Sequence, residues 1–137
     1  MLPMFVSDVP LHCINHAAIE FHVPAKLIIS ILNIERGKVG QAVKNSNGTY
    51  DLGPMQINTS WLPELRRYSI SRETVQYDPC VNVKVGAWIL AKSIAEEKSL
   101  LKGVGDYHSH TFKHNYPYYQ KVRVNFTNVN YILKKEA

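Results

Sequence analysis

One acidic residue, Glu35, lies on the apolar face of a predicted helix. Ile28, Ile31 and Glu35 follow the spacing i, i+3 and i+7, so the carboxylate points along the face that packs against the core. Burial without a partner and proximity to a helix C-terminus both disfavour a charged carboxylate, so both raise its pKa. A carboxylic acid that keeps its proton near neutral pH can act as a general acid. The alternative is a structural ion pair of Glu35 with Arg36, Lys38 or a more distant cation.

A polar stretch follows Glu35. Residues 38–53 are rich in Gly, Asn and Ser, which predicts a long ordered loop. This loop carries one carboxylate, Asp51, whose simplest role is that of a turn residue or an N-cap for the next helix. The amides of Gln56 and Asn58 can form hydrogen bonds but cannot act as bases at neutral pH. The sequence therefore predicts one acid beside a polar binding loop.

Helices must position these groups, and helical periodicity accounts for most of the chain. Apolar residues recur at helical spacing between single Pro and Gly residues. In the second predicted helix, Pro24 stands at the first helical position and Gly37 at the C-terminal cap. Helices are predicted over 10–22, 24–37, 54–65 and 79–97, after Gly103, and from about 117. For the last of these a strand is the alternative, because apolar residues alternate with period two around 122–126. The chain is thus predicted to be all-α, with one long polar loop.

The composition is that of one globular domain. The chain has 137 residues, 45% of them apolar and 20% charged, which excludes a disordered chain and a coiled-coil rod. The net charge of +5 is spread along the chain, which disfavours a nucleic-acid-binding module and leaves an acidic polymer as a suitable partner. No stretch reaches about 18 apolar residues, so no membrane span is expected. The apolar residues 1–6 lack a charged flank and are not expected to be a signal peptide.

Neither the histidines nor the cysteines predict a metal site. His12 and His16 share a helix face, but no Glu follows His12 as a helical zinc-protease motif requires. The cluster around His108 is expected to lie on the surface or in a loop. Cys13 and Cys80 fit neither a zinc ribbon nor a C-x-x-C pair. Either they are two buried thiols, or they form a disulfide that would stabilise the fold by about 4 kcal/mol and indicate a location outside the cytosol.

Five ordered motifs give the chain a specific resemblance. They are Glu35, N-x-N-G-T-x-D-x-G-P-M-Q-I-N over 45–58, D-P-C-x-N-V-x-x-G-A-W-I-L over 78–90, Tyr107-His108-Ser109, and Tyr118 four residues before Val122. Together they resemble the lysozyme-like soluble lytic transglycosylases. More narrowly, they are similar to the small specialised members found beside conjugation, type III and type IV secretion, and pilus systems. The resemblance implies that residues 1–137 form a single transglycosylase (SLT) domain with its core at about 11–124.

The resemblance also implies a fold and a reaction. The fold would belong to the α+β lysozyme-like superfamily, as a single compact domain that is mostly helical. Glu35 would be the sole general acid and base in non-hydrolytic cleavage of the MurNAc–GlcNAc bond of peptidoglycan, which leaves a 1,6-anhydro-MurNAc end. No cofactor and no metal are implied. The protein would act in the periplasm, and its partners would be glycan strands and components of an envelope-spanning secretion, conjugation or pilus apparatus.

The site residues are carried over by position. The substrate-binding positions would be Asn47, Met55, Gln56, Asn58, Tyr107, His108 and Tyr118. A disulfide between Cys13 and Cys80 is implied as well. The wider family has Ser after its Glu, Ser at position 47 and Asn at position 108, where this chain has Arg36, Asn47 and His108.

Two other functions remain as alternatives. Goose-type lysozymes, which resemble this family, carry carboxylates where this chain has Asn47 and Asn58, so hydrolysis is disfavoured. Asp51 is the only nearby carboxylate left. A peptidoglycan-binding assembly factor with little activity is the second alternative, although a binding groove gains nothing from burying the acid of Glu35.

Overall fold

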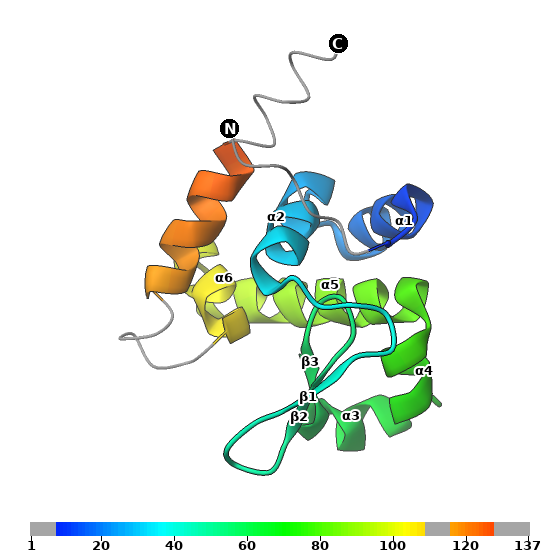
Figure 1. Cartoon of the computed structure of the whole chain (residues 1–137). Helices are drawn as coiled ribbons and strands as arrows, with labels where there is room; N and C mark the ends of the chain where they lie inside the picture. Colours follow the sequence, from blue (N-terminus) through cyan, green and yellow to red (C-terminus); the bar gives the residue numbers. More distant parts are fainter. Residues whose placement is uncertain (1–7, 109–115, 128–137) are drawn as a thin grey trace.

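The long helix α5 (Pro79–Glu97) is the centre of the fold (Figure 1). The computed structural model describes residues 8–108 and 116–127. Helices α1 (Leu11–Phe21), α4 (Arg72–Tyr77) and α6 (Leu100–His108) pack against α5. The remaining elements are α2 (Ala25–Glu35), the strands β1 (Ala42–Lys44), β2 (Tyr50–Leu52) and β3 (Ile57–Asn58), the 3-10 helix η1 (Thr59–Trp61), α3 (Leu62–Arg66) and a last helical segment over 116–127. The mostly helical class expected from the sequence is confirmed.

Local sequence explains how α5 begins. Asp78 is its N-cap, and the carboxylate accepts hydrogen bonds from the backbone N–H of Cys80 at 2.9 Å and of Val81 at 3.1 Å. Pro79 fills the first helical position, where no N–H is needed. Cys80, in this first turn, forms a disulfide with Cys13 of α1, and their Cα atoms are 4.9 Å apart. The disulfide implied by the resemblance is therefore present, and it joins the first helix to the central one.

A small antiparallel sheet occupies the stretch that was expected to be a loop. The strand order is β1-β2-β3, with Val43 opposite Asp51 and Leu52 opposite Ile57. Short polar strands of two or three residues carry too little apolar alternation to be recognised from the sequence. The sheet matters for function because it gives the polar residues fixed directions on a pleated surface.

Helix α2 ends one residue earlier than predicted. Its C-cap is Arg36, in the left-handed region at φ +55°, and Pro24 is the N-cap rather than the first helical residue. Gly37 has a different function, because a Cβ there would collide with the carbonyl oxygen of Gly53. The glycine permits the end of α2 to approach the turn that follows β2.

The helix predicted over 54–65 is wrong in its first half. Residues 53–56 form a tight turn in which Gly53 and Gln56 both have positive φ, which no α-helix tolerates. The chain then forms β3 and η1, and helix α3 begins only at Leu62. The short helix α4, capped by Ser71, was not predicted.

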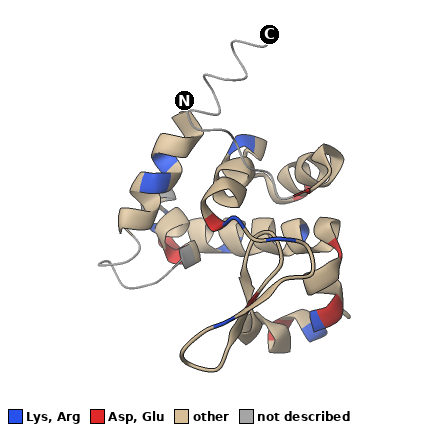
Figure 2. Cartoon of the chain, in the orientation of Figure 1, with Lys and Arg blue, Asp and Glu red and all other residues tan. Residues whose placement is uncertain are grey.

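The C-terminal elements agree better with the sequence. Helix α6 begins at Leu100, before Gly103, and a Cβ at Gly103 would collide with the backbone of Ile94 in α5. The segment over 116–127 is helical, so the strand left open there is excluded. Lys and Arg are distributed over several helices and loops of the described chain (Figure 2). Among the described helices, none has both the length and the apolar character that crossing a bilayer requires.

Candidate active site

A cleft of about 590 Å³ lies where the sheet meets the helices. Its wall on the helical side comes from the end of α2, from α5 and from α6, and its other wall comes from the hairpin, β3 and η1. The residues that line it are Ile34, Glu35, Asn45, Asn47, Thr49, Asp51, Gln56, Ile57, Asn58, Ser60, Trp61, Ile89, Asp106 and Tyr107. Elements that are distant in sequence thus line one cleft, and most of the side chains they contribute are polar.

Glu35 is the last residue of α2, and its side chain enters this cleft. One carboxylate oxygen, Oε2, is fully buried and has no hydrogen-bond partner among the described residues. The ion pairs of the described chain do not include Glu35, so the structural pairing with Arg36 or Lys38 is not found there. Burial first, and then the negative charge of Asp51, together raise the pKa of Glu35 from 4.5 to about 7. The raised pKa predicted from the apolar helix face is confirmed.

Asp51 faces the same cleft from strand β2. Its carboxylate accepts a hydrogen bond from Asn58 Nδ2 at 3.0 Å, across the β2–β3 pair. It therefore caps no helix and occupies no turn, which corrects the simpler role expected for it. A strand residue paired with a neighbouring strand places its carboxylate at a site that local sequence does not reveal.

The hydroxyl of Thr49 organises the amides around Asp51. It accepts hydrogen bonds from Asn45 Nδ2 at 3.1 Å and from Asn58 Nδ2 at 3.0 Å, and it donates to Asn47 Oδ1 at 2.6 Å. The other side of the Asn58 amide accepts from the backbone N–H of Ser60. Asn58 is thus held in one orientation, with its Nδ2 directed to both Thr49 and Asp51.

The turn at 53–56 is held from the central helix. Asn82 of α5 is fully buried, and its Oδ1 accepts from the backbone N–H of Met55 at 2.8 Å. Its Nδ2 donates to the carbonyl oxygens of Leu52 at 2.8 Å and Val75 at 3.0 Å. Gln56 follows in a left-handed conformation, and its Nε2 donates to the carbonyl oxygen of Gly53 at 3.1 Å. This strained residue is fixed at the cleft beside Glu35.

Two tyrosines support the cleft on the α6 side. The Tyr107 hydroxyl donates to the carbonyl oxygen of Met55 at 2.9 Å, and its ring stacks on Tyr118 with centroids 6.4 Å apart. Burial, followed by the charges of Glu35 and Asp51, raises the pKa of Tyr107 well above 10. Burial and then the charge of Glu35 do the same for the pKa of Tyr118. Both phenols therefore stay neutral close to the acid.

The structure distributes the expected site residues unevenly. Glu35, Asn47, Gln56, Asn58 and Tyr107 line the cleft. The Met55 side chain is fully buried against Gly86 in the core and does not line the cleft. Tyr118 lies buried behind Tyr107, and the side chain of His108 lies outside the described residues.

Sequence reasoning missed four residues that the structure places at or beneath the cleft. Thr49, Trp61 and Asp106 line it, and Asn82 holds its turn from below. Thr49 and Asn82 are polar residues inside the quoted motifs, so a polar residue within a motif was the available signal. Trp61 and Asp106 carried no local signal, because only the tertiary fold brings η1 and α6 to the cleft.

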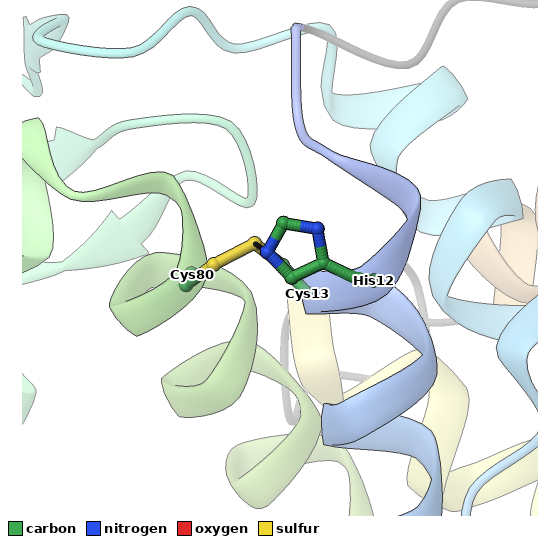
Figure 3. A group of neighbouring side chains, drawn as sticks. All are labelled: His12, Cys13 and Cys80. Carbon is green, nitrogen blue, oxygen red and sulfur yellow. Dashed lines mark hydrogen bonds between the residues drawn. A yellow bond between two sulfur atoms is a disulfide. The ribbon is translucent and has the colours of Figure 1, made fainter.

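The described chain has one group with the spacing of metal ligands, His12, Cys13 and Cys80, whose ligand atoms lie within 4.8 Å of one another (Figure 3). His12 Nε2 is 3.8 Å from Cys13 Sγ. Because the two sulfurs are bonded to each other, neither is a thiolate, and one imidazole remains as donor. This group lies at the disulfide, away from the cleft.

A mostly helical domain with a small sheet, and a buried carboxylic acid where the two meet, defines the lysozyme-like class of proteins. Comparison with known families identifies the member of that class. Residues 12–122 match the family described as "Transglycosylase SLT domain", and the chain belongs to this family. The resemblance inferred from the sequence motifs is thereby confirmed.

Several bacterial proteins are similar to the chain. The invasion protein IagB of Salmonella typhimurium is 33% identical over 100 residues, which cover 72% of this chain and 62% of that protein. Protein IpgF of Shigella flexneri is 31% identical over 100 residues, covering 72% of this chain and 66% of that protein. A peptidoglycan-binding-like protein of Escherichia coli O157:H7 is 26% identical over 137 residues, covering 91% of this chain and 82% of that protein. The chain thus spans a little under two thirds of the length of the Salmonella protein.

Proposed function

We propose that the protein is a peptidoglycan lytic transglycosylase that cleaves the MurNAc–GlcNAc bond without water. The observation that carries the proposal is the acid of Glu35, with a pKa of about 7, in a cleft lined by amides and tyrosine. At neutral pH such an acid is protonated in about half of the molecules, the condition that favours general acid catalysis. Membership of the SLT family supports the same reaction.

The chemistry follows from the proton of Glu35. It passes to the oxygen that bridges the two sugars, and the bond between this oxygen and C1 of MurNAc breaks. The acetamido group of the substrate stabilises the positive charge at C1. The Glu35 carboxylate then accepts the proton of the C6 hydroxyl, whose oxygen bonds to C1 and closes the 1,6-anhydro ring. Glu35 ends the cycle protonated, and burial of Oε2 favours that state at both ends.

We assign binding roles to the polar groups that line the cleft. Asn47 and Gln56 have amide groups at its surface, suited to the acetamido and hydroxyl groups of a glycan. The Asn58 amide is committed to Thr49, Asp51 and Ser60, so its role is to position Asp51 rather than to bind acetamido groups. Tyr107 forms a neutral wall of the cleft, and Tyr118 stacks behind it.

A hydrolytic reaction is the second candidate, and Asp51 is the observation that favours it. Two carboxylates in one cleft can divide the work of acid and of nucleophile or base. The charge of Asp51 acts on Glu35 strongly enough to raise its pKa, so the two groups face the same space. In this candidate Asp51 would stabilise C1 or activate water.

We further propose that the protein acts in the periplasm and opens the cell wall for a secretion, conjugation or pilus apparatus. The disulfide favours an oxidising compartment. One relative is named an invasion protein and another a peptidoglycan-binding-like protein, and both names agree with work at the envelope.

Purified protein and its Glu35→Gln variant, acting on peptidoglycan, test the function. Wild type should release anhydro-muropeptides, and Glu35→Gln should reduce the rate by at least about a thousand-fold, since amide replaces acid. Glu97→Gln is the matched control, because Glu97 is also the last residue of a helix but is exposed and does not line the cleft. Mass spectrometry separates the candidates, since hydrolysis adds one water, about 18 Da, to each product. Full activity of Glu35→Gln would refute the proposal, and binding without cleavage by wild type would leave the assembly factor.

A further inference from the structure

A second cavity, of about 530 Å³, lies outside the active site. It is lined by residues from the end of α1, the segment from α3 to α4, and one face of α5. Its apolar lining includes Phe21, Leu65, Val81 and Val85. Its polar groups include three hydroxyls, of Tyr68, Ser69 and Thr74, and the ion pair of Lys84 with Glu20. The aromatic residues Tyr68 and Trp88 stand over it, and Tyr68 is 66% exposed.

A row of aromatic rings joins this cavity to the active-site cleft. Trp61 lines the cleft, and its ring centroid is 5.7 Å from that of Trp88, at an interplanar angle of 75°. Trp88 in turn lies 6.4 Å from Tyr68, at 64°. The rings of Trp61, Trp88 and Tyr68 therefore form an unbroken series of contacts from the cleft to the second cavity.

The two lysines that lie against these rings and at the cavity are paired with acids. Lys92 lies over the rings of both Trp61 and Trp88, and its ammonium pairs with Glu64 at 3.2 Å. Lys84, at the rim of the cavity, pairs with Glu20 at 3.4 Å. With both cations paired to acids, the surface offers aromatic faces and hydroxyls rather than a binding site for anions. It suits a neutral sugar better than an acidic stem peptide.

We propose that the second cavity is an accessory site for an N-acetylated sugar of the glycan strand, beyond the sugars held in the cleft. The proposal rests on the function proposed above, since peptidoglycan is its ligand. The C–H face of a sugar ring packs on Tyr68 and Trp88, and the hydroxyls of Ser69 and Thr74 bond to the sugar. The site makes affinity depend on strand length, because only a strand that passes Trp61 reaches it.

Binding by the non-cleaving Glu35→Gln protein tests the site. Tyr68→Ala should weaken affinity for long glycan strands, freed of stem peptides by an amidase, by roughly three- to ten-fold, the loss of one aromatic contact. Affinity for tri-N-acetylglucosamine, which fits the cleft alone, should not change. Tyr68→Trp should restore binding. The control is Tyr77→Ala, because Tyr77 is 59% exposed and lines neither cavity.

Each other outcome overturns the proposal. Equal binding by Tyr68→Ala and Tyr77→Ala removes the site. If Tyr68→Ala loses affinity only for strands that keep their stem peptides, the cavity binds the peptide. If it loses affinity equally for tri-N-acetylglucosamine, Tyr68 belongs to the cleft itself. Cleavage by the Glu35→Gln protein tests the proposed function separately, since that measurement leaves Tyr68 intact.

Discussion

The end of helix α2 and strand β2 each bring one carboxylate to the same cleft, in opposite surroundings. Glu35 has a fully buried oxygen without a hydrogen-bond partner in the described chain, whereas Asp51 accepts a hydrogen bond from an amide that is itself fixed. The first environment disfavours the charged form and raises the pKa of Glu35. The two side chains are both carboxylates, so the difference between them lies in burial and hydrogen bonding rather than in residue type.

The largest expected effect comes from the cost of burying Glu35. The pKa of Glu35 rises from 4.5 in the unfolded chain to about 7 in the fold, so folding takes up a proton between these values. The contribution of Glu35 to stability is therefore most favourable below about pH 4.5, falls as the pH rises towards 7, and then levels off. The penalty above neutral pH is about 3 kcal/mol.

Glu35→Gln removes this penalty. Denaturant unfolding of the variant should give a free energy higher than wild type by about 2 to 3 kcal/mol at about pH 8, and nearly equal at about pH 4. The control Glu97→Gln should show no such divergence from wild type between the two pH values. If the difference in unfolding free energy between the two proteins did not grow between about pH 4 and about pH 8, the buried acid would be contradicted.

The sequence predicts only part of this contrast between Glu35 and Asp51, because only one of the two environments is determined by residues close in sequence. Glu35 was predictable because Ile28 and Ile31 share its helix face within two turns. Asp51 was not, because its environment depends on Asn58 of the neighbouring strand, and Asp-x-Gly is equally typical of a turn. The periodicity of apolar residues predicts which face of one helix or strand is buried. It does not predict which strands pair, because that depends on the tertiary fold.

The glycine and proline positions make the same point. Gly37 was interpreted as a helix cap, but it serves the close approach of α2 to Gly53. Pro54 was interpreted as a helix start, but Asn82, 27 residues after Met55, holds this segment in a turn. In both cases a plausible local role was replaced by a tertiary contact that no sequence window contains.

A smaller effect is expected when the charge of Asp51 is removed, which tests how far Asp51 contributes to the pKa of Glu35. Asp51→Asn should lower the pKa of Glu35, so the alkaline limb of the pH–rate profile should move to lower pH. Burial is the larger cause and remains, so the pKa should stay above 4.5. If Glu35 works alone, the maximal rate should fall by only several-fold.

The maximal rate decides whether Asp51 does more than this. A fall of about a hundred-fold or more would give it the role of nucleophile or base, and so favour hydrolysis. The exposed Asp8 provides the control variant Asp8→Asn. An unchanged alkaline limb would show that the two carboxylates are not coupled.

The smallest effect is expected at Thr49, which acts on Asp51 only through Asn58. Thr49→Val keeps the size of the side chain but removes the hydroxyl that accepts from Asn45 and Asn58 and donates to Asn47. Stability should fall by about 1 kcal/mol, the usual net value of such bonds. The Asn58 amide loses one of the two acceptors of its Nδ2, so Asp51 should be less well held and the rate should fall by a few-fold.

Thr49→Ser separates positioning from packing. Serine keeps the hydroxyl and loses a methyl group, so it should restore the rate and the alkaline limb even if part of the stability stays lost. If Thr49→Ser were as slow as Thr49→Val, packing of the hairpin rather than orientation of Asn58 would be the cause. The fixed amide would then contribute nothing to the difference between the two carboxylates, and burial of Glu35 alone would account for it.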